Sequence, residues 1–343
     1  MRNQTTKTVT AGVAVSLAVG AVALLSGCQE DVTTRTAVLS QYQTATADLA
    51  TSTRALSESI AQICQAPSEE RLAQAQHNWQ QAFLNWMPLQ GREKGSEAAL
   101  ALSWQIQFWP DKKNTTGRKL TQLLKQDTTW TPEAMAEQSV AVQGFGAMEW
   151  FLFDQSDALQ QAEGCQLAHA VSLRLADSAS QLQSAWQADP WQEMTPQMAL
   201  GEYLGALNNQ MDYTIKKLTR PMGKPGSPKP YQAEAWRAQY SLASLKASVA
   251  AMQALYLADG KGIDAMLRER GFADTATRIS QRFEYLLSGW PASEAMVPLL
   301  TSRDGYRELI NIYNGLEYIQ IALHDEVAPE LGVVVGFNAT DGD

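Results

Sequence analysis

The sequence has few of the residues that most cofactor and catalytic sites use. Its 343 residues include only three cysteines and three histidines. There is no CxxC pair, which argues against a redox motif or a zinc knuckle. No HExxH, G-x-S-x-G or phosphate-binding loop is present, so the common zinc-peptidase, hydrolase and nucleotide-binding signatures are missing. The net charge of −9 argues against nucleic acid as a partner.

Long apolar runs are also missing beyond the N-terminus, where the sequence resembles a lipoprotein export signal. Residues 11–25 form an apolar stretch of about 15 residues, which suits a signal-peptide core and is short for a membrane span. Residues 25–28 read Leu-Ser-Gly-Cys, the pattern of a lipobox. We therefore predict that 1–27 is a signal peptide and that Cys28 carries a lipid on the periplasmic side of a membrane. Gln29 favours the outer membrane, whereas an aspartate there would favour the inner membrane.

The two remaining cysteines are Cys64 and Cys165. The periplasm is oxidising, so an even pair there is most simply a disulfide. The alternative is a pair of buried free thiols.

The mature sequence is rich in Ala, Gln, Leu and Glu, which favour helices. Ser68, Thr131-Pro132 and Thr195-Pro196 mark helix starts, because a hydroxyl cap or an N-terminal proline suits the first turn. We predict helices near 31–64, 68–88, 116–126, 133–155, 159–188, 196–218, 232–258, 272–288 and 303–326, with an irregular stretch at 90–114.

Residues 220–231 contain four prolines and two glycines, which should interrupt any helix. We take this segment as a linker between an N-terminal bundle, 28–219, and a C-terminal bundle with its tail, 232–343. The predicted fold is therefore all-α with two helical bundles. Residues 145–150 align without gaps on 313–318, which suggests an internal duplication; chance similarity between amphipathic helices is the alternative.

Four segments, in this order, carry a family resemblance: 107–112, 144–153, 234–237 and 336–343. They resemble the imelysin-like family, named for an insulin-cleaving metallopeptidase, and especially its branch of periplasmic lipoproteins. The resemblance covers nearly all of the mature chain. It implies two helical bundles with a site between them, and a link to bacterial iron uptake.

The family's G-x-H-x-x-E segment falls on 144–149, where its histidine position is Gly146 and its glutamate is Glu149. Histidine and glutamate three residues apart on a helix could share one metal ion, whereas a lone carboxylate is a poor transition-metal site. Glu149 is either functional or a salt-bridged carboxylate at the edge of the bundle. His77 and His169 are better explained as structural residues, and His324 lies too far from Glu317 to share an ion with it.

A second group of candidates lies outside the motif. Trp109, Asp111 and Lys112 could form a pocket with Arg92, Arg118 and Arg237 for an anion such as a carboxylate or a chelated iron complex. Alternatively, Trp109 belongs to a core and the charges are solvated. The candidate ligand-binding residues are Glu149, Gly146, Trp109, Asp111, Lys112, Arg92, Arg118, Trp236, Arg237 and Glu317. Asp341 and Asp343 are either hard-cation ligands or part of a solvated tail.

These patterns predict a lipid-anchored binding protein of the cell envelope, not an enzyme, with an iron-uptake or other envelope protein as its partner. Iron or another divalent metal is the cofactor to test for. The alternatives are a metallopeptidase with a degenerate motif and a scaffold that docks an envelope partner.

Overall fold

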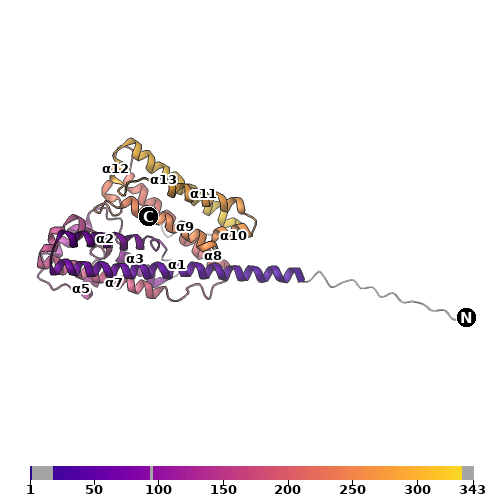
Figure 1. The fold of residues 1–343 in the computed structure, drawn as a ribbon, viewed down its shortest axis with the longest axis horizontal. Coiled ribbons are helices and arrows are strands. Elements are labelled where there is room, and N and C mark those ends of the chain that lie inside the picture. Colours follow the sequence, from indigo (N-terminus) through magenta and orange to yellow (C-terminus); the bar gives the residue numbers. More distant parts are fainter. Residues whose placement is uncertain (2–17, 93–95, 334–343) are drawn as a thin grey trace.

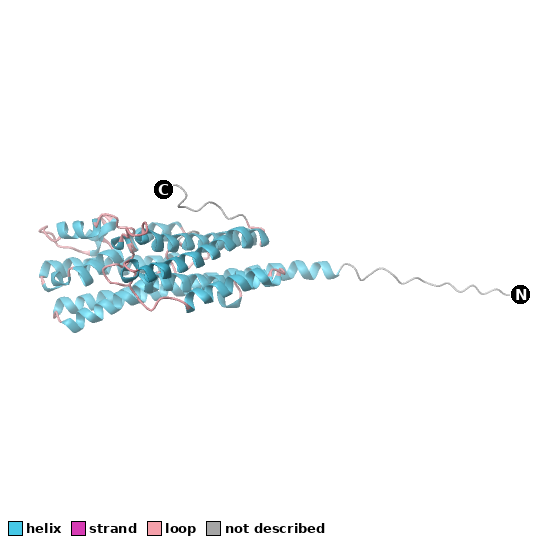
Figure 2. Cartoon of the chain, turned by 90° about the horizontal axis from the view of Figure 1, so that it is seen from above, coloured by secondary structure: helices cyan, strands magenta, loops and turns pink. Residues whose placement is uncertain are grey.

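The fold is built from helices that lie side by side along the long axis of the molecule (Figure 2). The computed structural model describes residues 1, 18–92 and 96–333, and for 18–32 it describes the backbone alone. Within these residues no strand forms, which confirms the all-α prediction. None of the helices described is long and apolar enough to cross a membrane.

The N-terminal bundle is organised around α1 (Ala18–Gln65), which packs along both α2 (Glu69–Trp86) and α7 (Ala162–Ala185). The shorter helices of this bundle are α3 (Glu97–Ile106), α4 (Thr115–Leu123), α5 (Pro132–Ala136) and α6 (Gly144–Glu149). The predicted disulfide is confirmed: Cys64 at the end of α1 is bonded to Cys165 in the first turn of α7.

The C-terminal bundle lies against one side of the first, drawn in orange and yellow in Figure 1. Its helices are α9 (Ser241–Leu257), α10 (Ile263–Glu269), α11 (Ala273–Ser288), α12 (Val297–Leu300), α13 (Arg303–Ala322) and α14 (Ala328–Glu330). The helix that precedes them is α8 (Pro196–Met222). Helix α8 packs on α9 and α13 and also contacts α1. The two bundles therefore meet along α8.

The predicted helix starts are confirmed. The hydroxyl oxygens of Ser68, Thr131 and Thr195 each accept a hydrogen bond from the backbone N–H three residues later, at 3.2, 3.2 and 3.3 Å. Such caps satisfy backbone donors that have no partner within the helix. They depend on local sequence alone, which is why they could be predicted.

The predicted secondary structure is wrong in three places. The helix expected over 133–155 is broken into α5, a 3₁₀ turn at Val140–Val142, α6 and a π-helical turn at Trp150–Asp154. The helix expected from residue 232 begins only at Ser241. The stretch expected to be irregular, 90–114, contains α3, which is capped by the Ser96 side chain.

Gly144 explains one of these breaks. Its φ is +70°, and a Cβ there would lie 2.1 Å from the carbonyl oxygen of Ile106. Glycine alone tolerates both this backbone and this close approach. The start of α6 is therefore fixed by its contact with the end of α3, which no local pattern reveals.

The predicted linker begins at residue 220, whereas α8 continues through Pro221 to Met222 and the chain leaves the helix at Gly223.

Other predictions stay untested. The domain boundary and the internal duplication remain predictions. Cys28 falls in α1, where only the backbone is described, and the tail with Asp341 and Asp343 lies outside the described residues.

Candidate functional site

Glu149 is the last residue of α6 and is 5% exposed. Its Oε1 accepts hydrogen bonds from the backbone N–H groups of Arg237 and Ala238, at 2.8 and 3.1 Å. The backbone adopts positive φ at Ala235 and Gln239, 50° and 55°, on either side of these donors. The segment before α9 therefore wraps around a carboxylate supplied by the N-terminal bundle.

Arg237 links this carboxylate to two other parts of the chain. Its Nη1 lies 3.7 Å from Glu149 Oε2, and its Nε lies 3.4 Å from an Asp154 oxygen. Its Nη2 donates to Asn114 Oδ1 at 2.7 Å. The guanidinium also lies over the Trp236 ring, 4.6 Å from its centroid. The predicted residues Glu149, Trp236 and Arg237 thus belong to one cluster.

Burial changes the acidity of Glu149. It raises the pKa of the carboxyl from its ordinary 4.5 to about 7, because an ionised group loses hydration inside the protein. Arg237 and the two backbone donors oppose that rise, while the nearby Glu234 adds to it. The carboxyl can therefore exchange a proton near neutral pH.

A small cavity opens beside Glu149. The space open to the centre of a water molecule is ≈ 30 Å³, enough for about two waters. The lining residues are Trp79, Phe83, Gln107, Phe108, Trp109, Asp111, Thr116, Phe145, Gly146, Glu149, Tyr231, Ala233, Ala235, Trp236 and Arg237. They come from both bundles, so the cavity lies between them. Its walls are largely aromatic, with Glu149, Asp111 and Arg237 as the charged groups.

Gly146 keeps one wall of this cavity open. A Cβ at this position would meet only the carbonyl oxygen of Phe108, at 3.9 Å, an ordinary contact distance. The position where the family motif has histidine therefore has room for a Cβ. A side chain there would lie one helical turn from Glu149.

Trp109 and Asp111 also line the cavity. Trp109 is 7% exposed, and its buried Nε1–H has no acceptor among the described residues. An unpaired buried donor is costly, so a ligand or water that accepts from it would be favoured. Asp111 has a structural task, since its carboxylate accepts from the backbone N–H groups of Thr115 and Thr116 at the start of α4, at 2.6 and 3.0 Å.

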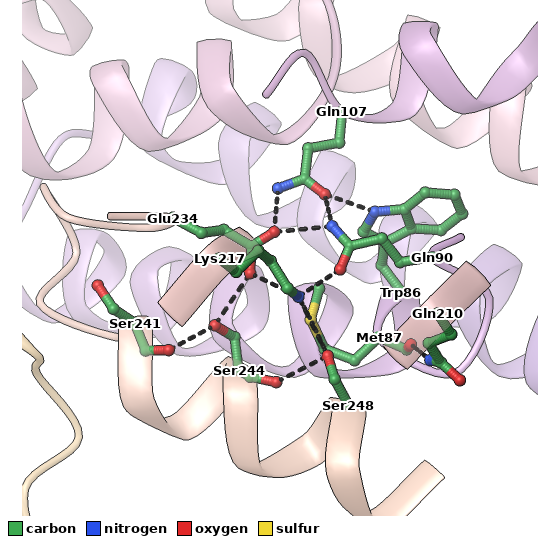
Figure 3. A network of polar contacts seen from close by, with 10 residues as sticks. All are labelled: Trp86, Met87, Gln90, Gln107, Gln210, Lys217, Glu234, Ser241, Ser244 and Ser248. Carbon is green, nitrogen blue, oxygen red and sulfur yellow. Dashed lines mark hydrogen bonds and ion pairs between the residues drawn. The ribbon is translucent and has the colours of Figure 1, made fainter. Parts of the chain in front are cut away.

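A buried polar network reaches the cavity through Gln107 and is drawn in Figure 3. Lys217 Nζ and Glu234 Oε2 are 3.0 Å apart, and both side chains are 2% exposed. Glu234 Oε1 accepts from Gln90 and Gln107 at 2.7 and 2.8 Å, and its Oε2 accepts from Ser244 at 3.2 Å. Burial lowers the pKa of Lys217, and Glu234 opposes that effect. Gln107 belongs to both the network and the cavity wall, so the two share a side chain.

The sequence prediction missed Lys217 and treated Glu234 only as part of a family segment. The pair is 17 residues apart and joins α8 to the loop before α9. One signal was present: Glu234 directly precedes the Ala235-Trp236-Arg237 run that wraps around Glu149.

Four predicted residues are not part of the cavity lining. Lys112 and Arg118 are exposed. Arg92 is buried but lines a different cleft. Glu317 lies on α13, where its Oε1 accepts from the Tyr313 hydroxyl at 2.6 Å. The lining residues that were not among the predicted site residues are Trp79, Phe83, Gln107, Phe108, Thr116, Phe145, Tyr231, Ala233 and Ala235.

The histidines do not contribute to the cavity either. His324 Nδ1 lies 2.6 Å from an oxygen of its exposed neighbour Asp325. Among the described residues, no group of three or more His, Cys, Asp or Glu side chains is placed to hold a metal ion. The donor set at Glu149 is therefore one carboxylate with Asp111 nearby.

Comparisons with known proteins agree with this architecture. The imelysin family model matches residues 38–323. An imelysin-like protein from Psychrobacter arcticum has a similar structure, with a TM-score of 0.74 and 20% identity over 90% of this chain and 98% of that one. An iron-regulated protein A precursor from Parabacteroides distasonis gives a TM-score of 0.67 and 14% identity over 87% and 95% of the two chains. A search of curated proteins found no matching sequence.

Proposed function

The chain belongs to the imelysin family, and we propose that it is a lipid-anchored periplasmic binding protein that serves iron uptake and holds a small polar ligand beside Glu149. The link to iron is supported by the relative described as iron-regulated. The proposed anchor rests on the lipobox that ends at Cys28.

The buried Glu149 carboxyl beside a cavity carries this proposal. Its Oε1 accepts from two backbone donors, whereas the one partner of its Oε2 among the described residues is Arg237, at 3.7 Å. Trp109 also lines the cavity, and its buried Nε1–H has no acceptor among the described residues. A ligand that donates to Glu149 and accepts from Trp109 would satisfy both groups. The cavity volume of ≈ 30 Å³ admits only a small ligand or one polar group of a larger one.

Growth under iron limitation tests the proposal. A strain that lacks the gene should grow more slowly than its parent when iron is chelated, and the wild-type gene should restore growth. Glu149→Gln should fail to restore it, because the amide cannot accept a ligand's proton or pair with its charge. Glu317→Gln, which changes a glutamate outside the cavity, should restore it fully. Equal growth of the deletion strain and its parent would refute the link to iron.

The lipid anchor gives a separate prediction. Cys28→Ala removes the thiol that would take the diacylglycerol, so the protein should lose lipid labelling and membrane association. Radiolabelled palmitate and membrane fractionation measure these two properties. The Cys64–Cys165 bond keeps both other cysteines out of this reaction, which makes the readout specific for Cys28. Wild-type palmitate labelling of the Cys28→Ala protein would rule out the anchor.

Zinc chemistry gives a third prediction. We expect the wild-type protein not to cleave unfolded insulin chains, because the motif offers Glu149 without histidine, and a catalytic zinc usually has three protein ligands. Gly146→His should raise zinc affinity at least about tenfold, the effect of one added ligand. The backbone around Gly146 leaves room for the Cβ of this side chain.

Titration against a chromophoric chelator measures the zinc affinity. Gly146→Ala is the matched control, since it adds a Cβ without an imidazole. A histidine variant that binds zinc no tighter than the alanine variant would show that Glu149 does not face a usable metal position. Chelator-sensitive cleavage by the wild type that is lost in Glu149→Gln would favour the peptidase alternative.

A further inference from the structure

A second cleft lies apart from the Glu149 cavity, lined by residues of α1, of α9 and of the segment at the end of α2. Its volume is ≈ 340 Å³, within the range of small-molecule sites. Its walls come from Gln41, Thr44 and Asp48 on α1, from Asn85 and Arg92 near the end of α2, and from Ala251, Ala254 and Asp259 around α9. The lining shares no residue with the Glu149 cavity.

Arg92 is the buried charge of this cleft, and the residue is 3% exposed. The described contacts of its guanidinium are with neutral acceptors: Nε donates to Gln210 Oε1 at 2.5 Å, and Nη2 donates to the Ala251 carbonyl at 2.7 Å. No described carboxylate forms an ion pair with it. Burial lowers the pKa of Arg92 to about 10, because a buried guanidinium loses hydration. A buried cation beside an open cleft favours an anionic group from a ligand.

The guanidinium is held in place before any ligand arrives. The Gln210 amide also donates to the Met87 carbonyl at 2.8 Å, and Asn209 Nδ2 donates to the Gly91 carbonyl at 2.6 Å. Gly91 has a φ of +80°, and a Cβ there would lie 3.2 Å from Gln210 Cα. The turn that carries Arg92 is therefore fixed against α8, and such pre-organisation lowers the entropic cost of binding.

The rim of the cleft carries the opposite charge. Asp48 and Asp259 both line the cleft and are exposed. Asp259 follows Ala258 in a left-handed turn, with φ values of 54° and 37°, that ends α9. Two rim carboxylates would repel a simple anion such as phosphate. They would attract the cationic end of a molecule whose anionic end reaches Arg92.

We propose that this cleft binds a small zwitterion of amino-acid size, with its carboxylate on Arg92 and its ammonium group at Asp48 and Asp259. The cleft supplies one buried cation for the first group and two exposed carboxylates for the second. The proposal is independent of the ligand beside Glu149, so either one can fail without the other.

Isothermal titration calorimetry of the purified full chain tests it, with the common free L-amino acids as probes, one at a time. At least one should bind saturably. Its N-acetylated form, which lacks the ammonium group, and its amide form, which lacks the carboxylate, should each bind at least about tenfold more weakly. Absence of saturable binding by every amino acid, or equal binding of the blocked forms, would overturn the proposal.

Variants locate the binding. Asp48→Asn and Asp259→Asn change exposed side chains and should leave the fold intact, while weakening the amino acid about tenfold in combination. Arg92→Lys should weaken it similarly, because lysine cannot keep the Nε and Nη2 contacts that hold the guanidinium in place. Glu149→Gln, in the other cavity, should leave the affinity unchanged. Full affinity in the Asp48→Asn, Asp259→Asn double variant would place the binding elsewhere and refute the assignment.

Discussion

Replacing Lys217 with methionine is expected to lower the free energy of unfolding by about 3–5 kcal/mol. Lys217 and Glu234 are each 2% exposed and their charged atoms lie 3.0 Å apart. Methionine has a similar volume but removes the ammonium group, so Glu234 would stay buried without its counter-charge. Urea denaturation of the wild type and the variant measures the difference.

Two further variants separate lost charge from lost packing. Adding Glu234→Gln to Lys217→Met removes the orphaned carboxylate while keeping an oxygen that accepts from Gln90 and Gln107. It should recover most of the lost stability. Lys216→Met, the neighbouring and partly exposed position on α8, should change stability by less than about 0.5 kcal/mol. Equal stability of Lys216→Met and Lys217→Met would show that the buried pair contributes nothing.

The same network connects the two bundles. Gln90 follows α2, Lys217 lies on α8, and Ser248 on α9 accepts from Lys217 at 3.1 Å (Figure 3). Gln107 joins the network through Glu234 and also lines the Glu149 cavity. Loss of Lys217 should therefore loosen the cavity as well as the fold.

Features determined by local chemistry were predictable from the sequence. The caps at Ser68, Thr131 and Thr195 need only a hydroxyl and the following turn, and the helical composition sets the fold class. The break at Gly144 was not predictable, because it depends on the approach of Ile106 from another helix. Helix periodicity shows which face is buried but not which distant segment covers it.

The candidate site was predictable only in part, for the same reason. The family motif identified Glu149, and the segment 234–237 supplied its partner Arg237. Arg92 was predicted to join the Glu149 site because of its charge. The turn that carries Arg92 packs against α8, and Arg92 lines the second cleft instead. The Lys217–Glu234 pair carries no sequence signature, because two charged residues on an otherwise amphipathic chain look solvated until the fold buries them.

Replacing Glu149 with glutamine is expected to stabilise the protein at about pH 8, by up to about 3 kcal/mol. Glutamine keeps the shape of the side chain and an oxygen for the N–H groups of Arg237 and Ala238. It removes a charge that the interior disfavours, since burial raises the pKa of Glu149 from 4.5 to about 7. Arg237 keeps its contacts with Asp154 and Asn114.

The difference in stability between the wild type and Glu149→Gln should depend on pH. Below about pH 4.5 the Glu149 carboxyl is protonated in both the folded and the unfolded chain, so wild type and variant should be similarly stable. Between about 4.5 and 7 the folded chain binds more protons, so the Glu149 contribution to stability falls as the pH rises. The full penalty applies above about pH 7, where the glutamine variant should have its greatest advantage.

Urea denaturation across this pH range compares the wild type with Glu149→Gln and with Glu317→Gln, the partly exposed control. Only Glu149→Gln should gain stability progressively, relative to the wild type, as the pH rises from 4.5 to 7. A variant less stable than the wild type at about pH 8 would mean that the Arg237 pairing outweighs the cost of burial, and Glu149 would then be a structural residue. If Glu149→Gln is more stable than the wild type but fails to restore growth in iron-limited medium, the Glu149 carboxylate is needed for function and not for folding. A carboxylate retained at a cost in stability is typical of a binding site, because the loss in stability is accepted in exchange for binding a ligand.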